Sequence, residues 1–406
     1  MPAEHPPADH RPTLPRRIGL AVVGLGGAVA TTVAAGLDLL ARGLAGHDGL
    51  PLAGRDELAP YGSLVVGGWD VIGDDLAAAA RAHGVLEPAQ LAAASPALAA
   101  LRPWPAAADP AFCRNVTGAN VVEAAGHRAA TELIRGDLRR FAAERRLDAT
   151  VVVNLASTER AVDRGAPALA TADAFEHGLD ADDPAIGPAM LYAYAAIRER
   201  VPYVNFTPSV AADVPALTKL AEIERVPIAG KDGKTGQTLL KTVLAPALRD
   251  RALRVDGWYS GNLLGNRDGL ALDDPSSRES KVASKTSALD ELLGYPVPDH
   301  VVTITYYRPR GDAKEAWDSI DLTGFLGQRM QLKINFLCRD SILAAPLVIE
   351  LARLLELAAR RGESGVQEQF GAFFKAPMTC GGGPAEHAFG AQQARLLAWL
   401  AGAPRD

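Results

Sequence analysis

The chain has 406 residues, of which 48% are hydrophobic, and it carries a formal net charge of −6. This length and composition suit a globular protein of two domains with sizeable cores, and the acidic balance gives no support to nucleic-acid binding. The three cysteines, Cys113, Cys338 and Cys380, are odd in number and far apart, so they predict neither a disulfide framework nor a zinc site.

The N-terminal region combines a proline-rich tail with an uncharged run. Residues 1–15 hold five prolines, and we expect a disordered tail there. The uncharged run 18–37 follows two arginines, as in a signal peptide or a membrane span, but glycines divide it. We therefore predict a buried strand at Ile18–Val23, a tight turn and a helix at 28–42. A secreted or membrane protein stays the alternative.

The next two hundred residues alternate between apolar runs and helical patterns. We expect strands at 63–66, 150–153 and 203–206, short helices within 75–112, and longer helices within 116–145 and 190–200. Strands that alternate with helices predict a doubly wound, mostly parallel sheet.

The pattern changes after about residue 237. Residues 301–307 and 330–336 alternate apolar and polar side chains with the period of half-buried strands. We predict a second sheet there, mixed or antiparallel, before the helical period returns at 347–360.

The turn after the first strand is rich in glycine. Gly24 and Gly26 match the first two glycines of a dinucleotide-binding fingerprint, and Gly27 follows them, but the third position is Val29. Asp70, at the end of the second apolar run, is our candidate ligand for a ribose. An ordinary glycine turn in an α/β domain stays the alternative.

A second glycine-rich loop, PIAGKDGKTGQT, spans residues 227–238. It ends like a nucleotide-binding P-loop, but Ile228 stands where that motif needs a glycine. Its backbone N–H groups and lysines could still bind an anion. A solvated turn that binds no ligand stays the alternative.

Several lysines lie in contexts that suit a phosphorylated substrate. Lys281 and Lys285 are four residues apart among serines, Lys314 follows Asp312 after a predicted strand, and Lys375 follows two phenylalanines. Solvated or snorkelling lysines are the alternative for each.

Together these motifs resemble one family, that of myo-inositol-1-phosphate synthase. The resemblance runs from about residue 18 to residue 400 and rests on ten motifs in register: GLGG, GGWD, STER, VPYVNFTPS, GKDGKTGQT, GNLLGNRDG, SKVASK, GDAK, RDSILAAP and KAP. Family members are isomerases with tightly bound NAD. They oxidise glucose 6-phosphate at C5, form an enolate, close C6 onto C1 and return the hydride.

The resemblance implies a set of site residues. Expected catalytic residues are Lys281, Lys285, Lys314, Lys375 and Asp232, with Lys281 moving the C5 proton, Lys285 holding phosphate, and Lys314 and Lys375 polarising substrate oxygens. Expected substrate contacts are Asn262, Thr235, Asp312, Asp340 and Lys234, with Asp312 orienting Lys314. Expected cofactor contacts are Gly24, Gly26, Gly27, Asp70, Ser157, Thr158 and Asp232. A monovalent or divalent cation is a further expectation, with Asp232 as its ligand, although Lys231 replaces an acid found in many members.

The resemblance also implies an architecture. We expect a Rossmann-like NAD-binding domain from residues 16–237 and 343–406, an inserted catalytic and tetramerisation domain at 238–342, and a cytoplasmic homotetramer with no nucleic-acid or membrane partner. Three alternatives stay open: a relative that closes another sugar phosphate, such as a ketohexose phosphate, to a five-membered ring; a simple NAD-dependent dehydrogenase; and a catalytically silent binding protein.

Overall fold

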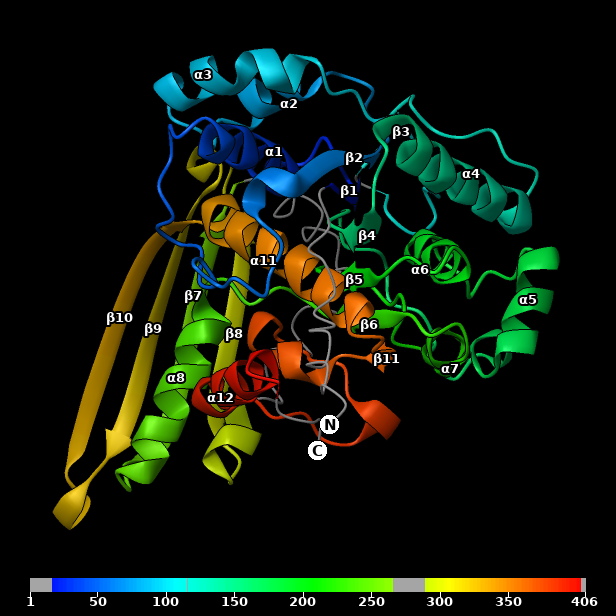
Figure 1. The fold of residues 1–406 in the computed structure, drawn as a ribbon. Coiled ribbons are helices and arrows are strands. Elements are labelled where there is room, and N and C mark those ends of the chain that lie inside the picture. Colours follow the sequence, from blue (N-terminus) through cyan, green and yellow to red (C-terminus); the bar gives the residue numbers. More distant parts are fainter. Residues whose placement is uncertain (1–16, 115, 266–288, 403–406) are drawn as a thin grey trace, which may run out of the picture.

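The protein contains two β-sheets (Figure 1). The computed structural model describes residues 17–114, 116–265 and 289–402. The first sheet has seven strands in the order β11-β6-β5-β4-β1-β2-β3, all parallel. Its strands are β1 (Ile18–Val23), β2 (Leu64–Asp70), β3 (Trp104–Pro105), β4 (Ala149–Asn154), β5 (Tyr203–Asn205), β6 (Pro227–Gly230) and β11 (Gly365–Val366).

The strand order places a crevice at the centre of this sheet. The chain runs outward from β1 through β2 to β3, then returns to β4 on the other side of β1 and continues to β6. In open α/β sheets, ligands bind at the carboxyl ends of the strands where the order reverses in this way. We therefore looked for the site above β1 and β4.

Helices cover both faces of the first sheet (Figure 1). One face carries α1 (Ala28–Ala41) and α11 (Asp340–Arg360), with α2 (Leu76–His83) and α3 (Pro88–Ala99) packed on α1. The opposite face carries α4 (His127–Arg145), α5 (Ala172–Asp180), α6 (Pro188–Arg198) and α7 (Pro215–Ile223). Alternate side chains of each strand enter the two cores, because successive residues of a strand point to opposite faces. Among the described helices, none combines the length and apolar composition that crossing a bilayer demands.

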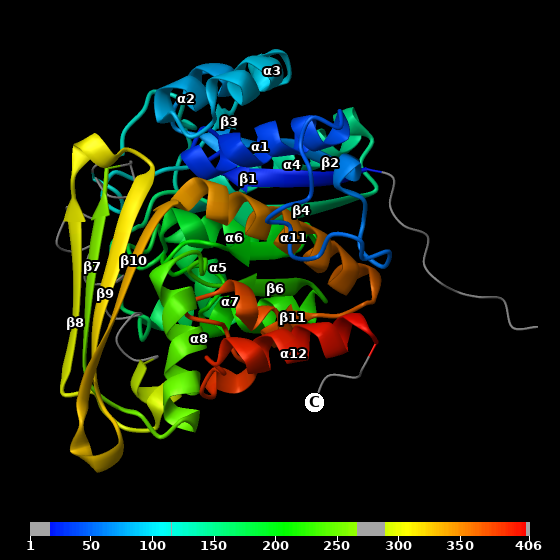
Figure 2. The ribbon, with the colours of Figure 1, turned by 90° about the vertical axis from the view of Figure 1, so that its left-hand side faces the viewer.

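The second sheet is mixed. Its order is β10-β9-β7-β8, with β7 and β8 parallel and the other neighbours antiparallel. Its strands are β7 (Arg254–Leu264), β8 (Asp299–Tyr306), β9 (Ala313–Thr323) and β10 (Arg329–Arg339). Figure 2 shows α8 (Gln237–Asp250) on the side of this sheet that faces the first one. Ala245 of α8 packs there with Trp258 and Ile320 in a third core. The last helix, α12 (Phe389–Leu400), contacts α8.

Short 3₁₀ segments complete the described structure: η1 (Tyr61–Ser63), η2 (Pro167–Leu169), η3 (Arg308–Arg310), η4 (Phe325–Gly327), η5 (Glu368–Phe373) and η6 (Cys380–Gly382).

The predicted fold class is confirmed, with three local corrections. The helix expected within 116–145 begins only at His127. The segment before it, described at residues 106–114 and 116–126 and called the strap below, contains turns and bends and no regular helix. The side-chain amide of Asn120 holds this segment by donating to the Asp70 and Trp104 carbonyls. The helix expected from 347 begins seven residues earlier, at Asp340. The segment with Lys314 follows β8, as predicted, but Lys314 itself is already the second residue of the next strand, β9.

Candidate active site

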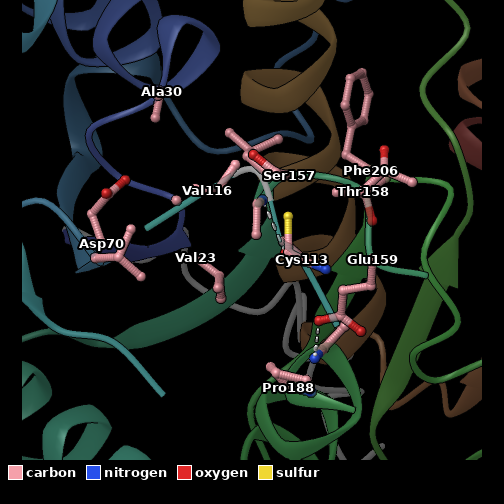
Figure 3. Close-up of a pocket in the computed structure, with 18 of the residues that line it drawn as sticks. Val23, Ala30, Asp70, Cys113, Val116, Ser157, Thr158, Glu159, Pro188 and Phe206 are labelled. Atoms are coloured by element: carbon pink, nitrogen blue, oxygen red, sulfur yellow. Dashed lines mark hydrogen bonds between the residues drawn. The ribbon is translucent and has the colours of Figure 1, made fainter. Parts of the chain in front are cut away.

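A cavity of about 400 Å³ lies at the carboxyl ends of the central parallel strands. It extends from Asp70, at the end of β2, to Asp232 and Lys375, beyond the end of β6. Residues of the strap, within 106–113 and 116–121, form part of its wall. Figure 3 shows part of the cavity, with Asp70 on one side and Ser157, Thr158 and Glu159 on the other. Its volume falls within the range of about 300–1,000 Å³ that small-molecule sites occupy.

The glycine turn after β1 forms one end of the cavity. Gly24 has φ +87°, and a Cβ on it would lie 3.0 Å from the backbone of Ala156. Gly27 precedes α1 without a side-chain cap, and the first turn of α1 holds no acidic residue, so its N–H groups are available to an anion. The geometry suits the pyrophosphate of a dinucleotide.

Asp70 stands beside this turn. Its Oδ2 accepts a hydrogen bond from the backbone N–H of Gly26 at 2.8 Å, and a Cβ on Gly26 would lie 3.1 Å from the same oxygen. The carboxylate thus stands where a dinucleotide presents its adenosine ribose. The glycines and the acid expected to bind the cofactor therefore meet, although 46 positions separate Gly24 from Asp70.

The loop after β4 supplies the next part of the wall. Ser157 and Thr158, which the resemblance predicts to contact the cofactor, both line the cavity, and Thr158 is buried. Glu159 also lines it, although the sequence analysis gave this residue no role. Its Oε1 accepts a hydrogen bond from the backbone N–H of Ala189 at 2.9 Å, and burial raises the pKa of its carboxyl group to about 8.

Two lysine–carboxylate pairs lie at the far end. Lys375 Nζ donates to Asp232 Oδ1 at 2.7 Å, and the backbone N–H of Lys375 donates to the Asp232 carbonyl at 2.6 Å. Lys314 Nζ lies 3.6 Å from Asp340 Oδ2, whose other oxygen accepts a hydrogen bond from Thr235 at 2.9 Å. Asp232, Thr235, Asp340 and Lys375 all line the cavity. Four expected site residues from three distant segments therefore converge with Lys314.

Asp312, just before β9, supports this arrangement by holding the start of α11. Its carboxylate accepts hydrogen bonds from the Ser341 hydroxyl at 2.7 Å and the Ser341 N–H at 3.3 Å. The carbonyl of Asp312 accepts from the N–H of Lys314 at 2.9 Å. Within the described residues, the side-chain ion pair of Lys314 is with Asp340, so the orienting role expected of Asp312 stays a prediction.

Lys234 points away from the cavity wall. Its ammonium donates to Gln392 of α12 at 2.5 Å and lies 5.5 Å from the centre of the Phe389 ring. Burial lowers the pKa of Lys234 to about 7. The side chain holds the loop 231–236 against α12, and the substrate contact expected of Lys234 stays a prediction.

Asn262 is buried in β7 beneath α8. Its amide nitrogen donates to Gln237 Oε1 at 2.6 Å and to the Thr303 carbonyl at 3.2 Å. Its Oδ1 is buried and has no hydrogen-bond partner among the described residues. The expected lysines Lys281 and Lys285 lie outside the described residues.

Most of the chain is similar to known proteins. Residues 50–401 match a family model described as myo-inositol-1-phosphate synthase, an NAD-binding family. Inositol-3-phosphate synthase 1 of Bacteroides thetaiotaomicron is 40% identical over 384 residues, which cover 89% of this chain and 90% of that protein. Inositol-3-phosphate synthase of Saccharomyces cerevisiae is 34% identical over 77% of this chain and 64% of its own length. The crystal structure of inositol-3-phosphate synthase from Caenorhabditis elegans superposes with a TM-score of 0.90 at 28% identity, covering 97% of this chain and 87% of that one.

Proposed function

We propose a reaction for this protein, which belongs to the myo-inositol-1-phosphate synthase family. The protein is an inositol-3-phosphate synthase that cyclises D-glucose 6-phosphate to 1D-myo-inositol 3-phosphate. The relatives do not favour the alternative of a five-membered carbocycle from a ketohexose phosphate. The observation that carries the assignment is the convergence of two lysine–carboxylate pairs at one end of a dinucleotide-shaped cavity.

The residues present fit NAD. The pyrophosphate would bind at Gly24, Gly26, Gly27 and the first turn of α1. The adenosine ribose would bind to Asp70. Ser157 and Thr158 would form the wall beside the nicotinamide half. Bound NAD would supply the acceptor and later the donor of a hydride at C5, so the cycle would consume no net reductant.

The lysine–carboxylate pairs would serve the charges that develop on the substrate. Enolisation and ring closure place negative charge on substrate oxygens, and fixed cations stabilise that charge because they need no reorganisation. Lys375 lines the cavity and is held by Asp232, so we assign it to a substrate oxygen. Asp340 and Thr235 would bind sugar hydroxyls, and Lys314 would act beside them.

The phosphate of the substrate fits the N-terminus of α8. Gly236 precedes this helix without a side-chain cap, and its first turn holds no acidic residue. A Cβ on Gly236 would lie 3.9 Å from Lys314 Nζ, which places a cation beside the open N–H groups. Lys285 and Lys281, with the roles that the resemblance gives them, complete this proposal.

We assign no step to a metal cation. The carboxylate of Asp232, the expected ligand, is already neutralised by Lys375 at 2.7 Å. The described residues contain no group of three His, Cys, Asp or Glu side chains that could hold a metal ion. Lys231, which replaces an acid found in many members, pairs with Asp213 at 3.0 Å.

We infer a homo-oligomer that uses the outer face of the second sheet. Figure 2 shows no described helix on that face. Trp317 and Leu337 are exposed there, at 39% and 61%, and Trp317 stacks on Tyr259. Two copies would cover this apolar surface, in keeping with the tetramer that the resemblance implies. Three free cysteines suit the cytoplasmic location proposed for the chain.

The reaction is tested by product analysis. Purified protein is incubated with glucose 6-phosphate and less than stoichiometric NAD, and the phosphate esters are analysed by NMR. We expect inositol 3-phosphate in excess over NAD, without accumulation of NADH. NADH formed in step with product would indicate a simple dehydrogenase, and turnover restricted to a ketohexose phosphate would indicate the five-membered ring. Either result would overturn the assignment.

A further inference from the structure

Glu159 is a buried acid in the cofactor cavity that the mechanism above does not use. The residue is 8% exposed and lines the cavity. Its backbone N–H donates to the Ser209 hydroxyl at 3.0 Å, and its Oε1 accepts from the backbone N–H of Ala189, in the first turn of α6, at 2.9 Å (Figure 3). The first contact holds the backbone of Glu159, and the second holds one oxygen of its carboxyl group.

The second carboxyl oxygen is left for a ligand. Oε2 has no hydrogen-bond partner among the described residues. It is not one of the polar atoms that are both fully buried and unpartnered, so part of its surface is accessible. A Cβ on Gly187 would come within 2.7 Å of Oε2 and within 2.7 Å of the Phe112 ring, so glycine at 187 keeps space around this oxygen. The carboxyl group therefore has one anchored oxygen and one oxygen without a partner in the described part of the chain, which lies near Gly187 beside Phe112, itself a residue of the cavity wall.

The surroundings keep this group protonated near neutral pH. Burial raises its pKa to about 8, and the Ala189 N–H and Arg160 oppose that shift while Asp109 adds to it. Arg160 lies over the Phe112 ring at 4.1 Å, and the hydroxyl of Tyr192 in α6 accepts a hydrogen bond from the backbone N–H of Ala107 in the strap. With the acid neutral, its free oxygen can carry a proton and act as a donor.

The position of Glu159 in the cavity indicates which part of a bound cofactor it would contact. Asp70, at β2, marks the adenosine ribose, and Asp232 with Lys375, after β6, marks the reacting end. Glu159 follows β4 and is bonded to the loop after β5, which lies between these ends in the strand order. That is where the nicotinamide half of the cofactor would lie.

We propose that the carboxyl group of Glu159 donates a hydrogen bond to the carboxamide oxygen of the nicotinamide ring. The inference rests on the proposed function, because it takes NAD as the cofactor. A neutral acid can fix the ring in one orientation without placing a negative charge beside it. An ionised carboxylate would lose the donor and would set an acceptor oxygen against the carboxamide oxygen, which would weaken binding of the cofactor.

The test measures NAD affinity without any sugar phosphate. The protein is freed of nucleotide with charcoal, its fold is checked by circular dichroism, and the Kd for NAD is determined by calorimetry from about pH 6 to about pH 9. The variants are Glu159→Gln, which keeps a neutral donor, and Glu159→Ala, which removes it. Asp109→Asn is the matched control, because it neutralises another carboxylate of the same wall.

For the native protein we expect a constant Kd below pH 7 and a rise that approaches about tenfold per pH unit above pH 8, as the donor is lost. Glu159→Gln should bind nearly as tightly at neutral pH and show no such rise, Glu159→Ala should bind weakly throughout, and Asp109→Asn should keep the rise. A rise retained in Glu159→Gln, or Gln binding as weakly as Ala at neutral pH, would overturn the proposal. Because the experiment measures NAD binding and not turnover, its result can be interpreted even if the protein does not cyclise glucose 6-phosphate.

Discussion

The pair Lys375–Asp232 offers a way to separate structural from catalytic roles. Lys375→Met keeps the aliphatic stem and removes the ammonium, while Asp232→Asn keeps the shape of the acid and removes its charge. The two side chains are 11% and 4% exposed and their charged atoms are 2.7 Å apart. Each single change therefore leaves an almost buried group without its partner, whereas the double change removes both charges together.

The expected magnitudes differ for stability and for turnover. Removing one partner of a buried pair costs about 3–5 kcal/mol, whereas neutralising both partners costs far less. We therefore expect each single variant to unfold at lower urea and the double variant to recover most of that loss. Turnover should behave differently, because a cation aimed at developing charge is worth about 10²–10³ in kcat and the double variant does not restore it.

The assay combines urea unfolding with single-turnover and steady-state kinetics on the three variants. Low kcat in the double variant, despite recovered stability, is the expected outcome. Recovery of both stability and kcat in the double variant would refute the reasoning, since Lys375 would then act only by neutralising Asp232.

Three further predictions concern other parts of the molecule. Arg353→Leu should lower the free energy of unfolding by about 3–5 kcal/mol, because it leaves the fully buried Glu350 carboxylate without its cation; a loss below about 1 kcal/mol in urea unfolding would contradict this. The folded pKa of Lys234, about 7, lies below its unfolded value, so the unfolded state binds more protons between about pH 7 and pH 10 and the stability of the native protein should rise with pH in that window. Lys234→Met should be most stabilising at pH 7 and should lose that advantage by about pH 10; an advantage independent of pH would count against burial as the cause. Leu337→Asp should shift sedimentation to smaller assemblies, whereas Leu44→Asp, at a similarly exposed leucine remote from the second sheet, should not; unchanged sedimentation of Leu337→Asp would exclude the outer face as the interface.

The alternation of strands and helices predicted the first sheet well, because buried parallel strands are short apolar runs that a turn and a helix follow. The glycine turn and Asp70 were predicted together, although the distance between them exceeds the usual spacing. The spacing is long because an extra segment lies between α1 and β2. Arg353 of α11 holds this segment through hydrogen bonds to the Ala59 and Leu52 carbonyls. A local pattern could not reveal contacts nearly three hundred residues apart.

Three features could not be predicted from the sequence, and each has a physical reason. The glycines of β7 interrupt its apolar period, and Gly261 is required because a Cβ there would lie 2.5 Å from Trp317 of β9. The pairing of Lys314 with Asp340 depends on the meeting of β9 and α11, which no spacing encodes. Glu159 lies within the STER motif, but its burial arises from α6 and the strap, so its sequence context alone could not show a raised pKa.

Hydride retention tests the central claim most directly. Glucose 6-phosphate that carries deuterium at C5 is converted by the protein, and the product is analysed by NMR and mass spectrometry. If the cofactor stays in the cavity and returns what it removed, inositol 3-phosphate will keep the deuterium on the corresponding ring carbon. Product that has lost the deuterium, or deuterated NADH free in solution, would contradict a closed oxidation and reduction cycle at this site.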